Sequence, residues 1–427
     1  MTNLEQHSIS TLLSSLPKTA FALAVVCFLT IVEPRLVQAQ TFTVIHTFTG
    51  VPDGAHPQAG LRIDESGNLY GTAEQGGAGY GTVFKLAQRN SHWVFTPLYQ
   101  FAGGYDGSYP AARVTIGADG NLYGSTGGGG QGGSCDGCGT VFSLQPPPNP
   151  CLSALCPWRK TTIYRFLGPP NDGESPQGDL ALDPAGSLYG TTFSGGSDGW
   201  GTVYRLTQSN GNWSEGILHS FTGDGGGAEP SSGVILDSSG NIYGTDLTES
   251  GNSGQIFELT PSGSGWAFHE LYEFQGGSDG GFSEGGLIFD RSGNLYGATS
   301  TAGSGGGGTA YELVHSNGGW NFTMLCSFVG SPRSGPVASL LMDSAGNLYG
   351  TTLFGGIYGY GSVFKLTPHS GGYAYTSLHD FTGERDGSSP YSSLIFDASG
   401  NLYGTTAYGG SGVACSGGCG VVFEITP

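Results

Sequence analysis

The sequence has little charge, and least of all positive charge. Charged residues make up 11 % of the 427 residues, less than half of the roughly 25 % found in average proteins. This argues against long helices and coiled coils, which are built largely from Ala, Leu, Glu and Lys. Only 14 Lys and Arg stand against 33 Asp and Glu, which gives a net charge of −19. We therefore expect no nucleic-acid partner, because phosphates are bound by clusters of Lys and Arg.

Long apolar runs are almost absent as well. One run of 13 residues, 20–32, follows Lys18, and Val37 and Ala39 lie three and one residues before a cleavage point. This pattern is typical of a secretory signal peptide, here residues 1–39. A retained membrane anchor is the alternative, but such a helix spans only about 20 Å of a roughly 30 Å apolar bilayer core. We expect an exported protein, secreted or periplasmic, with no membrane span in the mature chain.

Motifs of catalysis and metal binding are missing or no more frequent than chance. No His-Glu-x-x-His and no EF-hand spacing occurs. Gly-x-Ser-x-Gly surrounds Ser197 and Ser278. About two such matches arise by chance in a chain so rich in Gly and Ser, and a nucleophile elbow also needs a strand-to-helix turn. We therefore expect no catalytic residue, no metal site and no cofactor.

Glycine is the residue that the chain has in excess. Its 80 glycines are about 19 % of the sequence, against roughly 7 % on average. Many belong to the motif Asp-x-x-Gly-Asn-Leu-Tyr-Gly-Thr, whose tyrosine recurs at Tyr70, Tyr123, Tyr189, Tyr243, Tyr296, Tyr349 and Tyr403. The spacing is 53 or 54 residues, apart from one interval of 66. Seven copies at one period indicate a repeat architecture.

Each repeat contains four segments with the composition of β-strands. A short apolar segment precedes the Asp, and the Asn-Leu-Tyr-Gly-Thr segment follows it. A third segment opens on Gly with an aromatic residue three positions later, and a fourth ends on Phe. Four strands per repeat predict an all-β fold, a seven-bladed β-propeller with four strands per blade, as a single domain over residues 40–427. A parallel β-helix is the alternative, but its repeats are usually shorter, at about 20–30 residues.

The chain begins and ends in the middle of a repeat. Residues 42–48 have the pattern of a fourth strand, and residues 421–425 that of a third. We therefore expect the N-terminal strand to join the last blade and close the ring, which hides both edges. The interval of 66 residues is explained by a proline-rich insertion at 145–157, between the third and fourth strands of its repeat.

The consensus Asp-x-x-Gly-Asn-Leu-Tyr-Gly-Thr-Thr, followed by Gly-Thr-Val-Phe-Lys-Leu-Thr, resembles the GloVer-type tandem repeat of exported bacterial proteins. These are often called choice-of-anchor proteins, because their repeats precede various C-terminal sorting signals. The resemblance covers residues 41–427 and implies the repeated fold and export, but no activity. Two departures concern Gly117, which replaces the Asp of the motif, and the C-terminus, where we expect no anchor.

The repeated acidic residues are explained by turns. In six repeats an Asp precedes a Gly by three residues, and we predict that it caps its own turn: Asp64, Asp183, Asp237, Asp290, Asp343 and Asp397. A second Asp-Gly pair follows the Phe in five repeats, at Asp53, Asp106, Asp172, Asp279 and Asp386. Turn formation is expected there too. Loose calcium binding is the alternative, since Ca²⁺ takes about 6–8 oxygens.

Of the eight cysteines, Cys27 belongs to the predicted signal peptide. Export and the lack of neighbouring His favour local disulfides over zinc or redox sites. The predicted disulfide cysteines are Cys135 and Cys138, Cys151 and Cys156, and Cys415 and Cys419. Cys326 is left over. It precedes Phe328 by two residues, a position held by His or Tyr in the other repeats, so we interpret it as a structural strand residue and not a nucleophile.

The ligand is expected on one face of the propeller. Connections after the second and fourth strands of a blade open on the same face, and the repeats differ most there. Exposed aromatic side chains beside carboxylates suit sugar rings, although these rings could equally pack over the blade ends. The candidate ligand-binding residues are Tyr80, Tyr105, Trp200, Tyr358 and Tyr360.

Two functions fit this pattern. The first is a secreted, non-enzymatic binding or structural module for carbohydrate or protein. The second is an extracellular carbohydrate-active or lactone-processing enzyme with its site at the mouth of the propeller tunnel. An enzyme is expected to concentrate non-repeating His, Asp, Glu or Arg at one end of the tunnel. A scaffold is expected to show only the repeated positions there.

Overall fold

The computed structural model describes residues 40–130, 135, 137–147, 157–223, 227–247, 253–316, 318–330 and 334–426. The predicted signal peptide, Cys151, Cys156 and most of the predicted insertion at 145–157 lie outside the described residues. Residues Thr41–Thr426 form one compact unit. The described part is built from β-strands and one 3-10 turn, η1 (Gly104–Asp106). None of its helical turns has the length and apolar character needed to cross a bilayer.

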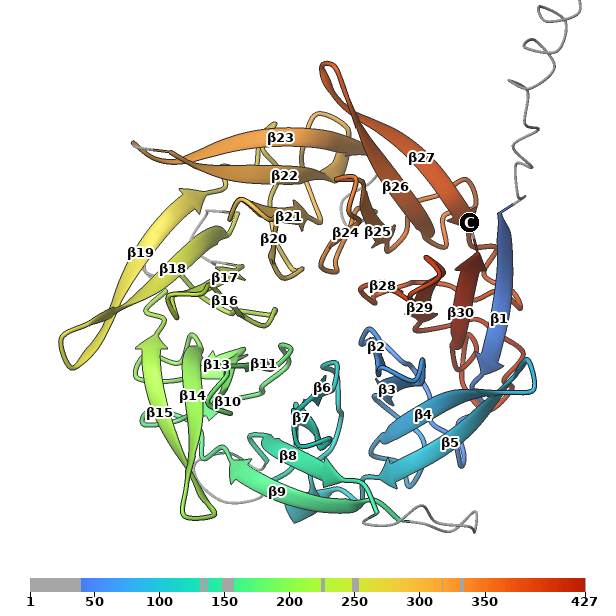
Figure 1. Ribbon diagram of the computed structural model, residues 1–427, viewed down its shortest axis with the longest axis horizontal. Coiled ribbons are helices and arrows are strands. Elements are labelled where there is room, and N and C mark those ends of the chain that lie inside the picture. Colours follow the sequence, from blue (N-terminus) through green and yellow to red (C-terminus); the bar gives the residue numbers. More distant parts are fainter. Residues whose placement is uncertain are drawn as a thin grey trace, which may run out of the picture. The chain divides into compact units, whose positions relative to one another are not determined.

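Seven four-stranded antiparallel sheets are arranged in a ring, so the predicted seven-bladed β-propeller is confirmed (Figure 1). Blade 1 consists of β2 (Arg62–Ile63), β3 (Leu69–Ala73), β4 (Thr82–Arg89) and β5 (His92–Gln100). Blade 2 consists of β6 (Thr115–Ile116), β7 (Leu122–Thr126), β8 (Thr140–Gln145) and β9 (Arg159–Arg165). Blade 3 consists of β11 (Ala181–Leu182), β12 (Leu188–Thr192), β14 (Thr202–Ser209) and β15 (Asn212–Ser220).

The remaining blades repeat this order, with a two-residue strand at the centre of the ring. Blade 4 consists of β16 (Ile235–Leu236), β17 (Ile242–Asp246), β18 (Gln255–Ser262) and β19 (Gly265–Glu273). Blade 5 consists of β20 (Ile288–Phe289), β21 (Leu295–Thr299), β22 (Gly306–Ser316) and β23 (Gly319–Val329). Blade 6 consists of β24 (Leu341–Met342), β25 (Leu348–Thr352), β26 (Ser362–His369) and β27 (Gly372–Asp380). A separate pair, β10 (Gly173–Glu174) and β13 (Ser194–Gly195), joins two loops beside blade 3.

Blade 7 is assembled from both ends of the ring. It consists of β28 (Ile395–Phe396), β29 (Leu402–Thr406), β30 (Val421–Thr426) and the N-terminal β1 (Thr41–Thr47). β1 runs antiparallel to β30 with Thr41 opposite Thr426 and Thr47 opposite Val421 (Figure 1). The predicted closure by the N-terminal strand is therefore confirmed, and strand pairing together with side-chain packing joins the ends of the ring.

The hydrophobic core lies between blades. Each of seven clusters of buried side chains combines residues of two neighbouring blades. Between blades 1 and 2, for example, Phe101 and Val83 pack with Val114, Leu122 and Phe142. Because every sheet buries both of its faces in this way, a single blade has no core of its own. The ring is therefore stabilised as a whole.

The glycine of each Asn-Leu-Tyr-Gly-Thr segment is explained by a ring on the neighbouring strand. Gly71 of β3 pairs with Phe84 of β4, and a Cβ on Gly71 would lie 2.5 Å from the Phe84 ring. The aromatic side chain therefore lies flat across the glycine. Phe84 itself is fully buried, so a larger residue at position 71 would displace a ring of the core.

The fourth strand of each blade contains a β-bulge. In blade 1, Pro97 pairs with Phe84 and Tyr99 pairs with Val83, which leaves Leu98 as the extra residue. A bulge lets consecutive side chains turn towards the same side. Leu98 and Tyr99 accordingly both pack into the cluster shared with blade 2. This explains why Ile or Leu stands three residues before each terminal Phe in the sequence.

The repeated Asp is a turn cap, as predicted. One carboxylate oxygen of Asp64 accepts the backbone N–H groups of Ser66 and Asn68, and the other accepts the Asn68 amide and the Tyr70 hydroxyl. Burial alone would raise the pKa of Asp64, but these hydrogen bonds hold it below its usual value. In blade 2, where Gly117 replaces this Asp, the carboxylate of Asp119 bonds Asn121 and the hydroxyl of Tyr123 instead.

Candidate functional site

One face of the propeller is formed by the connections that follow the second and fourth strands, and we call it the loop face. β-bridges join the two kinds of connection. These bridges pair Ala55 with Gln75, Ser108 with Gly128, Gly281 with Thr301 and Ser388 with Tyr408. The opposite face carries the Asp-capped turns and the hairpins between third and fourth strands. Since the capped turns are nearly identical from blade to blade, chemical variety is concentrated on the loop face.

Exposed apolar side chains gather on the loop face. Of the 16 large hydrophobic side chains that are exposed among the described residues, three lie along outer strands: Val94, Met324 and Tyr375. The other thirteen lie in the loop-face connections or, for Val329, at the end of a strand that reaches them. They are Val51, Tyr80, Tyr105, Tyr109, Leu167, Phe282, Val329, Phe354, Ile357, Tyr358, Tyr360, Tyr408 and Val413. Apolar groups collected on one face are a feature of interaction surfaces.

All five candidate ligand-binding residues lie in loop-face connections, but they differ in exposure. Tyr105 is 65 % exposed and Tyr358 56 % exposed, whereas Tyr80 and Tyr360 are 41 % and 49 % exposed. Trp200 is half-buried and packs against the cluster between blades 3 and 4. The five residues belong to connections of blades 1, 3 and 6, so they are distributed around the ring and do not form one cluster.

Three of these rings have a structural task. The rings of Tyr80, Trp200 and Tyr360 cover the glycines Gly103, Gly223 and Gly383 of the following connection. A Cβ on any of those glycines would lie 2.6–2.8 Å from the ring. The backbone carbonyl of Tyr80 also accepts the N–H of Tyr109. These aromatic residues therefore pack over the blade ends, whereas Tyr105 and Tyr358 cover none of the glycines that the structure describes.

The Asp-Gly connections are held by side chains of the outer strands. The carboxylate of Asp106 accepts the hydroxyl of Tyr99 at 2.7 Å and the backbone N–H of Ala102 at 2.8 Å. Lys160 of blade 2 completes the network, at 2.9 Å from the same carboxylate. The other four members of this group, Asp53, Asp172, Asp279 and Asp386, likewise bond a His or Tyr of the outer strand and a backbone N–H. These carboxylates thus serve the predicted turns.

Two hollows that share lining residues lie at the centre of the ring, and together we call them the tunnel. The hollow nearer the loop face is lined by residues that precede the innermost strand of every blade, among them Gln58, Gln177, Ser231, Glu284 and Tyr391. A second hollow lies along the innermost strands of blades 3 to 5, with Leu182, Leu236 and Phe289 in its wall. No histidine lines either hollow among the residues that the structure describes.

Three charged residues that do not repeat meet where the two hollows join. Arg113 of blade 2 holds Asp179 of blade 3 through its backbone N–H at 2.8 Å and its Nε at 2.6 Å. Arg62 of blade 1 lies close enough that Arg113 and burial lower its pKa to about 10. Burial would raise the pKa of Asp179, but the charges of Arg113 and Arg62 keep it below its usual value. The cluster therefore carries a net positive charge at neutral pH.

This cluster was not predicted from the sequence. At the position of Arg113 and Asp179 the other blades have Gly or Ser, namely Gly60, Gly233, Gly286, Ser339 and Ser393. A comparison of the seven repeats position by position would have revealed both substitutions. It could not have revealed that Arg113 and Asp179 face one another across neighbouring blades.

A second ionisable group lies at the outer rim, between blades 2 and 3. The hydroxyl of Tyr164 donates to Asp172 at 2.9 Å, and Glu215 lies beside both. Burial and the charge of Asp172 raise the pKa of Glu215 to about 7. Burial also raises the pKa of Asp172, although hydrogen bonds from Leu167 and Tyr164 oppose this. The sequence analysis assigned no role to Glu215.

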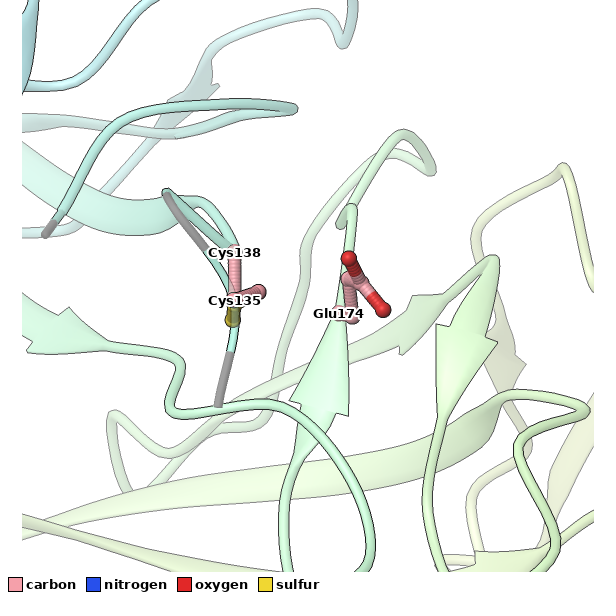
Figure 2. Close-up of side chains that lie close together, drawn as sticks. All are labelled: Cys135, Cys138 and Glu174. Atoms are coloured by element: carbon pink, nitrogen blue, oxygen red, sulfur yellow. A yellow bond between two sulfur atoms is a disulfide. The ribbon is translucent and has the colours of Figure 1, made fainter. Parts of the chain in front are cut away.

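Four of the six predicted disulfide cysteines lie in loops that the structure describes. Cys415 is bonded to Cys419, and Cys135 to Cys138. Glu174 of β10 lies next to the second pair (Figure 2), and ligand atoms of the three residues are within 4.8 Å of one another. Metals are bound by thiolates rather than by disulfide sulfurs, so in this form the group offers a metal only the carboxylate. Cys326 is a free thiol in β23.

Three solved structures are similar to this chain at low sequence identity, and one of them reaches a TM-score of 0.50. A polysaccharide lyase of family PL25, an ulvan lyase bound to a GlcA–Rha3S oligosaccharide, is 10 % identical and has a TM-score of 0.50, over 88 % of this chain and 95 % of that one. A Bacteroides uniformis protein assigned as a 6-phosphogluconolactonase is 15 % identical, with a TM-score of 0.47 over 86 % and 89 % of the two chains.

A Thermus thermophilus protein assigned as an oxidoreductase (glucose dehydrogenase) is 15 % identical, with a TM-score of 0.46 over 91 % of this chain and 100 % of that one. These likenesses concern the fold alone. No curated protein sequence matches the chain. The model of the Gloeobacter/Verrucomicrobia repeat matches residues 33–155, 155–341 and 290–427. The chain is therefore a member of the Gloeobacter/Verrucomicrobia repeat family, in agreement with the motif that recurs along its sequence.

Proposed function

We propose that this protein is a non-enzymatic binding module that acts outside the cytoplasm and takes a carbohydrate or a protein on its loop face. The observation that carries the proposal is the distribution of exposed apolar side chains. Thirteen of the 16 lie on that face, while the opposite face carries nearly identical polar turns. The signal-peptide pattern of residues 1–39 and the resemblance to exported proteins support a location outside the cytoplasm.

Tyr105 and Tyr358 are the strongest candidates for ligand contact. Both are more than half exposed, and within the described part of the chain neither covers a glycine. An aromatic ring held on a rigid scaffold can stack on a sugar ring or on an apolar side chain with little loss of conformational freedom. Tyr80, Trp200 and Tyr360 contribute to this face chiefly by fixing the shape of the connections.

Asp179 is poorly suited to act as a general acid, which favours binding in the tunnel over catalysis by proton donation. Asp179 is held by Arg113, and its lowered pKa keeps it ionised. A carboxylate held in this way does not donate protons at neutral pH. The positive charge that remains on Arg62 and Arg113 would attract an acidic group of a ligand that enters from the loop face.

The test is a binding survey with the purified protein on glycan arrays and against extracellular protein fractions, in calcium and in EDTA. We expect binding that does not depend on calcium and that falls at least tenfold in Tyr105→Ala or Tyr358→Ala. Val94→Ala is the matched control, since Val94 is exposed on an outer strand. If Val94→Ala lowers binding as much as the tyrosine variants do, the loop face is not the binding surface.

An enzyme remains the second candidate, favoured by one observation. Non-repeating charged residues do gather in the tunnel, as an enzyme of the carbohydrate-active or lactone-processing kind would require. Hydrolysis and elimination assays on sugar lactones and acidic polysaccharides test this function. Activity that disappears in Asp179→Asn, while the melting temperature stays unchanged, would replace the binding proposal with the enzymatic one.

A further inference from the structure

The outer rim of the propeller contains a repeated contact between neighbouring blades. In six of the seven fourth strands, a His or Tyr after the bulge points towards the next blade. At four junctions this ring stacks on a Phe of the next fourth strand, with centroids 3.7–4.3 Å apart and planes within 13°. The pairs are His46 with Phe95, His219 with Phe268, Tyr272 with Phe322, and His379 with Phe42.

Two junctions replace the stacked Phe by a charged residue but keep the first ring. Tyr99 meets Lys160, whose ammonium lies 5.9 Å from the ring centroid, and Tyr164 meets Glu215. At these six junctions, therefore, the position after the bulge always holds an aromatic or imidazole ring.

The junction between blades 5 and 6 lacks this ring. Cys326 takes its place in β23, and the residue opposite is Tyr375 of β27. Tyr375 is oriented like Phe95. It lies nearly parallel to Phe364, at 25° and 5.9 Å, and edge-on to Phe328, at 83° and 6.1 Å. Its other face, which a His or Tyr would cover at the stacked junctions, is open, and Tyr375 is 45 % exposed while Phe95 is half-buried.

The missing ring leaves a hollow of about 410 Å³. Apolar groups of Phe328, Val329, Ile357 and Tyr375 line it, with the thiol of Cys326 and the carboxylate of Asp380 at its wall. A hollow of this size lies within the range of sites for small molecules, and mostly apolar walls with a few polar groups are typical of such sites.

We propose that this hollow binds a small ligand through a single aromatic ring that carries a hydroxyl or a ring N–H. The ring would stack on the open face of Tyr375, in the place that an imidazole or phenol occupies at the other junctions. At five of those junctions the structure shows the polar atom of the ring bonded to a carboxylate, as the hydroxyl of Tyr272 is to Asp279 at 3.1 Å. Here Asp380 and the hydroxyl groups of Ser327 and Ser377 supply the polar partners.

The hollow borders the loop face at Val329 and Ile357, but neither Tyr105 nor Tyr358 is among its lining residues, so the two sites can be tested separately. The probes are p-cresol and 4-methylimidazole, which carry the rings of Tyr and His, with cyclohexanol as the non-aromatic control. Titration calorimetry with the purified protein is expected to show saturable binding of one equivalent of p-cresol or 4-methylimidazole. Cyclohexanol is expected to bind at least tenfold more weakly, because it cannot stack.

The decisive variant is one that fills the hollow with a side chain of the protein itself. Cys326→Tyr restores the residue present at three other junctions and is expected to weaken p-cresol binding at least tenfold, while Cys326→Ala keeps it within about twofold. Equal binding to Cys326→Tyr and the native protein overturns the proposal, as does a native protein that binds neither probe or that binds cyclohexanol equally well.

A second measurement covers the case in which Cys326→Tyr does not fold. Saturating p-cresol is expected to slow alkylation of Cys326 by iodoacetamide in the native protein, measured on the peptide that contains Cys326 by mass spectrometry. An alkylation rate that p-cresol leaves unchanged places the probe elsewhere and overturns the proposal.

Discussion

The imidazole of His379 in blade 6 stacks on the ring of Phe42 in β1, with centroids 3.7 Å apart and planes 7° from parallel. The N-terminal strand thus makes two kinds of contact. It pairs with β30 to complete blade 7, and its Phe42 also packs against blade 6. Phe48, just beyond β1, is fully buried in the cluster between blades 7 and 1. A single strand therefore connects three blades of the ring.

Deletion of residues 41–50 is expected to abolish cooperative unfolding. The deletion removes the outer strand of blade 7, exposes β30 as an open edge and empties the position of Phe48. Differential scanning calorimetry on a chain that starts at Val51 is the measurement, with a chain that starts at Gln40 as the control. An unchanged melting curve for the shorter chain would contradict closure by β1.

Asp64→Ala is expected to lower the free energy of unfolding by about 1–3 kcal/mol, because it leaves the donors of Asn68 and Tyr70 without their acceptor. The exposed neighbour Glu65 provides the control as Glu65→Ala. Since hydrogen bonds lower the folded-state pKa of Asp64, its contribution is present above the usual pKa of 3.8 and disappears as the pH falls further. Denaturation in urea at pH 7 and pH 3 should show a difference between variant and native protein at pH 7 that shrinks at pH 3.

Glu215 is expected to make the protein less stable as the pH rises from 5 to 8. The folded protein keeps this proton up to about pH 7, whereas the unfolded chain releases it near the usual value of 4.5. The folded state therefore binds more protons in this window, and the free energy of unfolding falls with rising pH. Glu215→Gln should remove this fall in the free energy of unfolding, which we expect to be on the order of 1–2 kcal/mol when solvent screening is allowed for.

The control for Glu215 is Glu65→Gln, at an exposed glutamate of a surface turn. Urea midpoints measured at intervals between pH 5 and pH 8 give the comparison. If Glu215→Gln shows the same slope with pH as the control, Glu215 titrates in the folded protein as it does in the unfolded chain.

Two tyrosines that are two residues apart should respond differently to truncation. Tyr360→Ala uncovers Gly383 and is expected to cost about 1 kcal/mol of stability. Tyr358→Ala removes a ring that is 56 % exposed and should leave the stability within about 0.5 kcal/mol. Thermal melting of both variants is the measurement. Equal destabilisation would show that Tyr358 also packs over the blade ends.

The sequence predicted the ring and the turns because both follow from features that repeat. Asp64 and its equivalents recur at one spacing with Gly and Asn in fixed places, so local turn chemistry determines their conformation. The same reasoning assigned Cys326 to a strand, where the structure has it. Even the departure at Gly117 is compensated locally, since Asp119 lies two residues away.

The tunnel cluster and the hollow at Cys326 could not be predicted in this way. Arg113 and Asp179 lie 66 residues apart and meet only because neighbouring blades place their innermost connections side by side. The volume beside Cys326 depends on whether Tyr375 and Ile357 move in to fill it. The contact between the Tyr80 ring and Gly103 likewise joins two connections. Their relative position in space does not follow from the repeat period of the sequence.

The break in the polypeptide inside blade 7 has a consequence for protein engineering. Thr41 and Thr426 are direct partners across two antiparallel strands, so a short flexible linker can join them without bending either strand. New termini could then be opened at a hairpin such as that between β14 and β15, where exposed residues connect the strands. A circular permutant made in this way would keep every blade contact. It would convert a ring closed at one seam by non-covalent contacts into one whose seam is covalent.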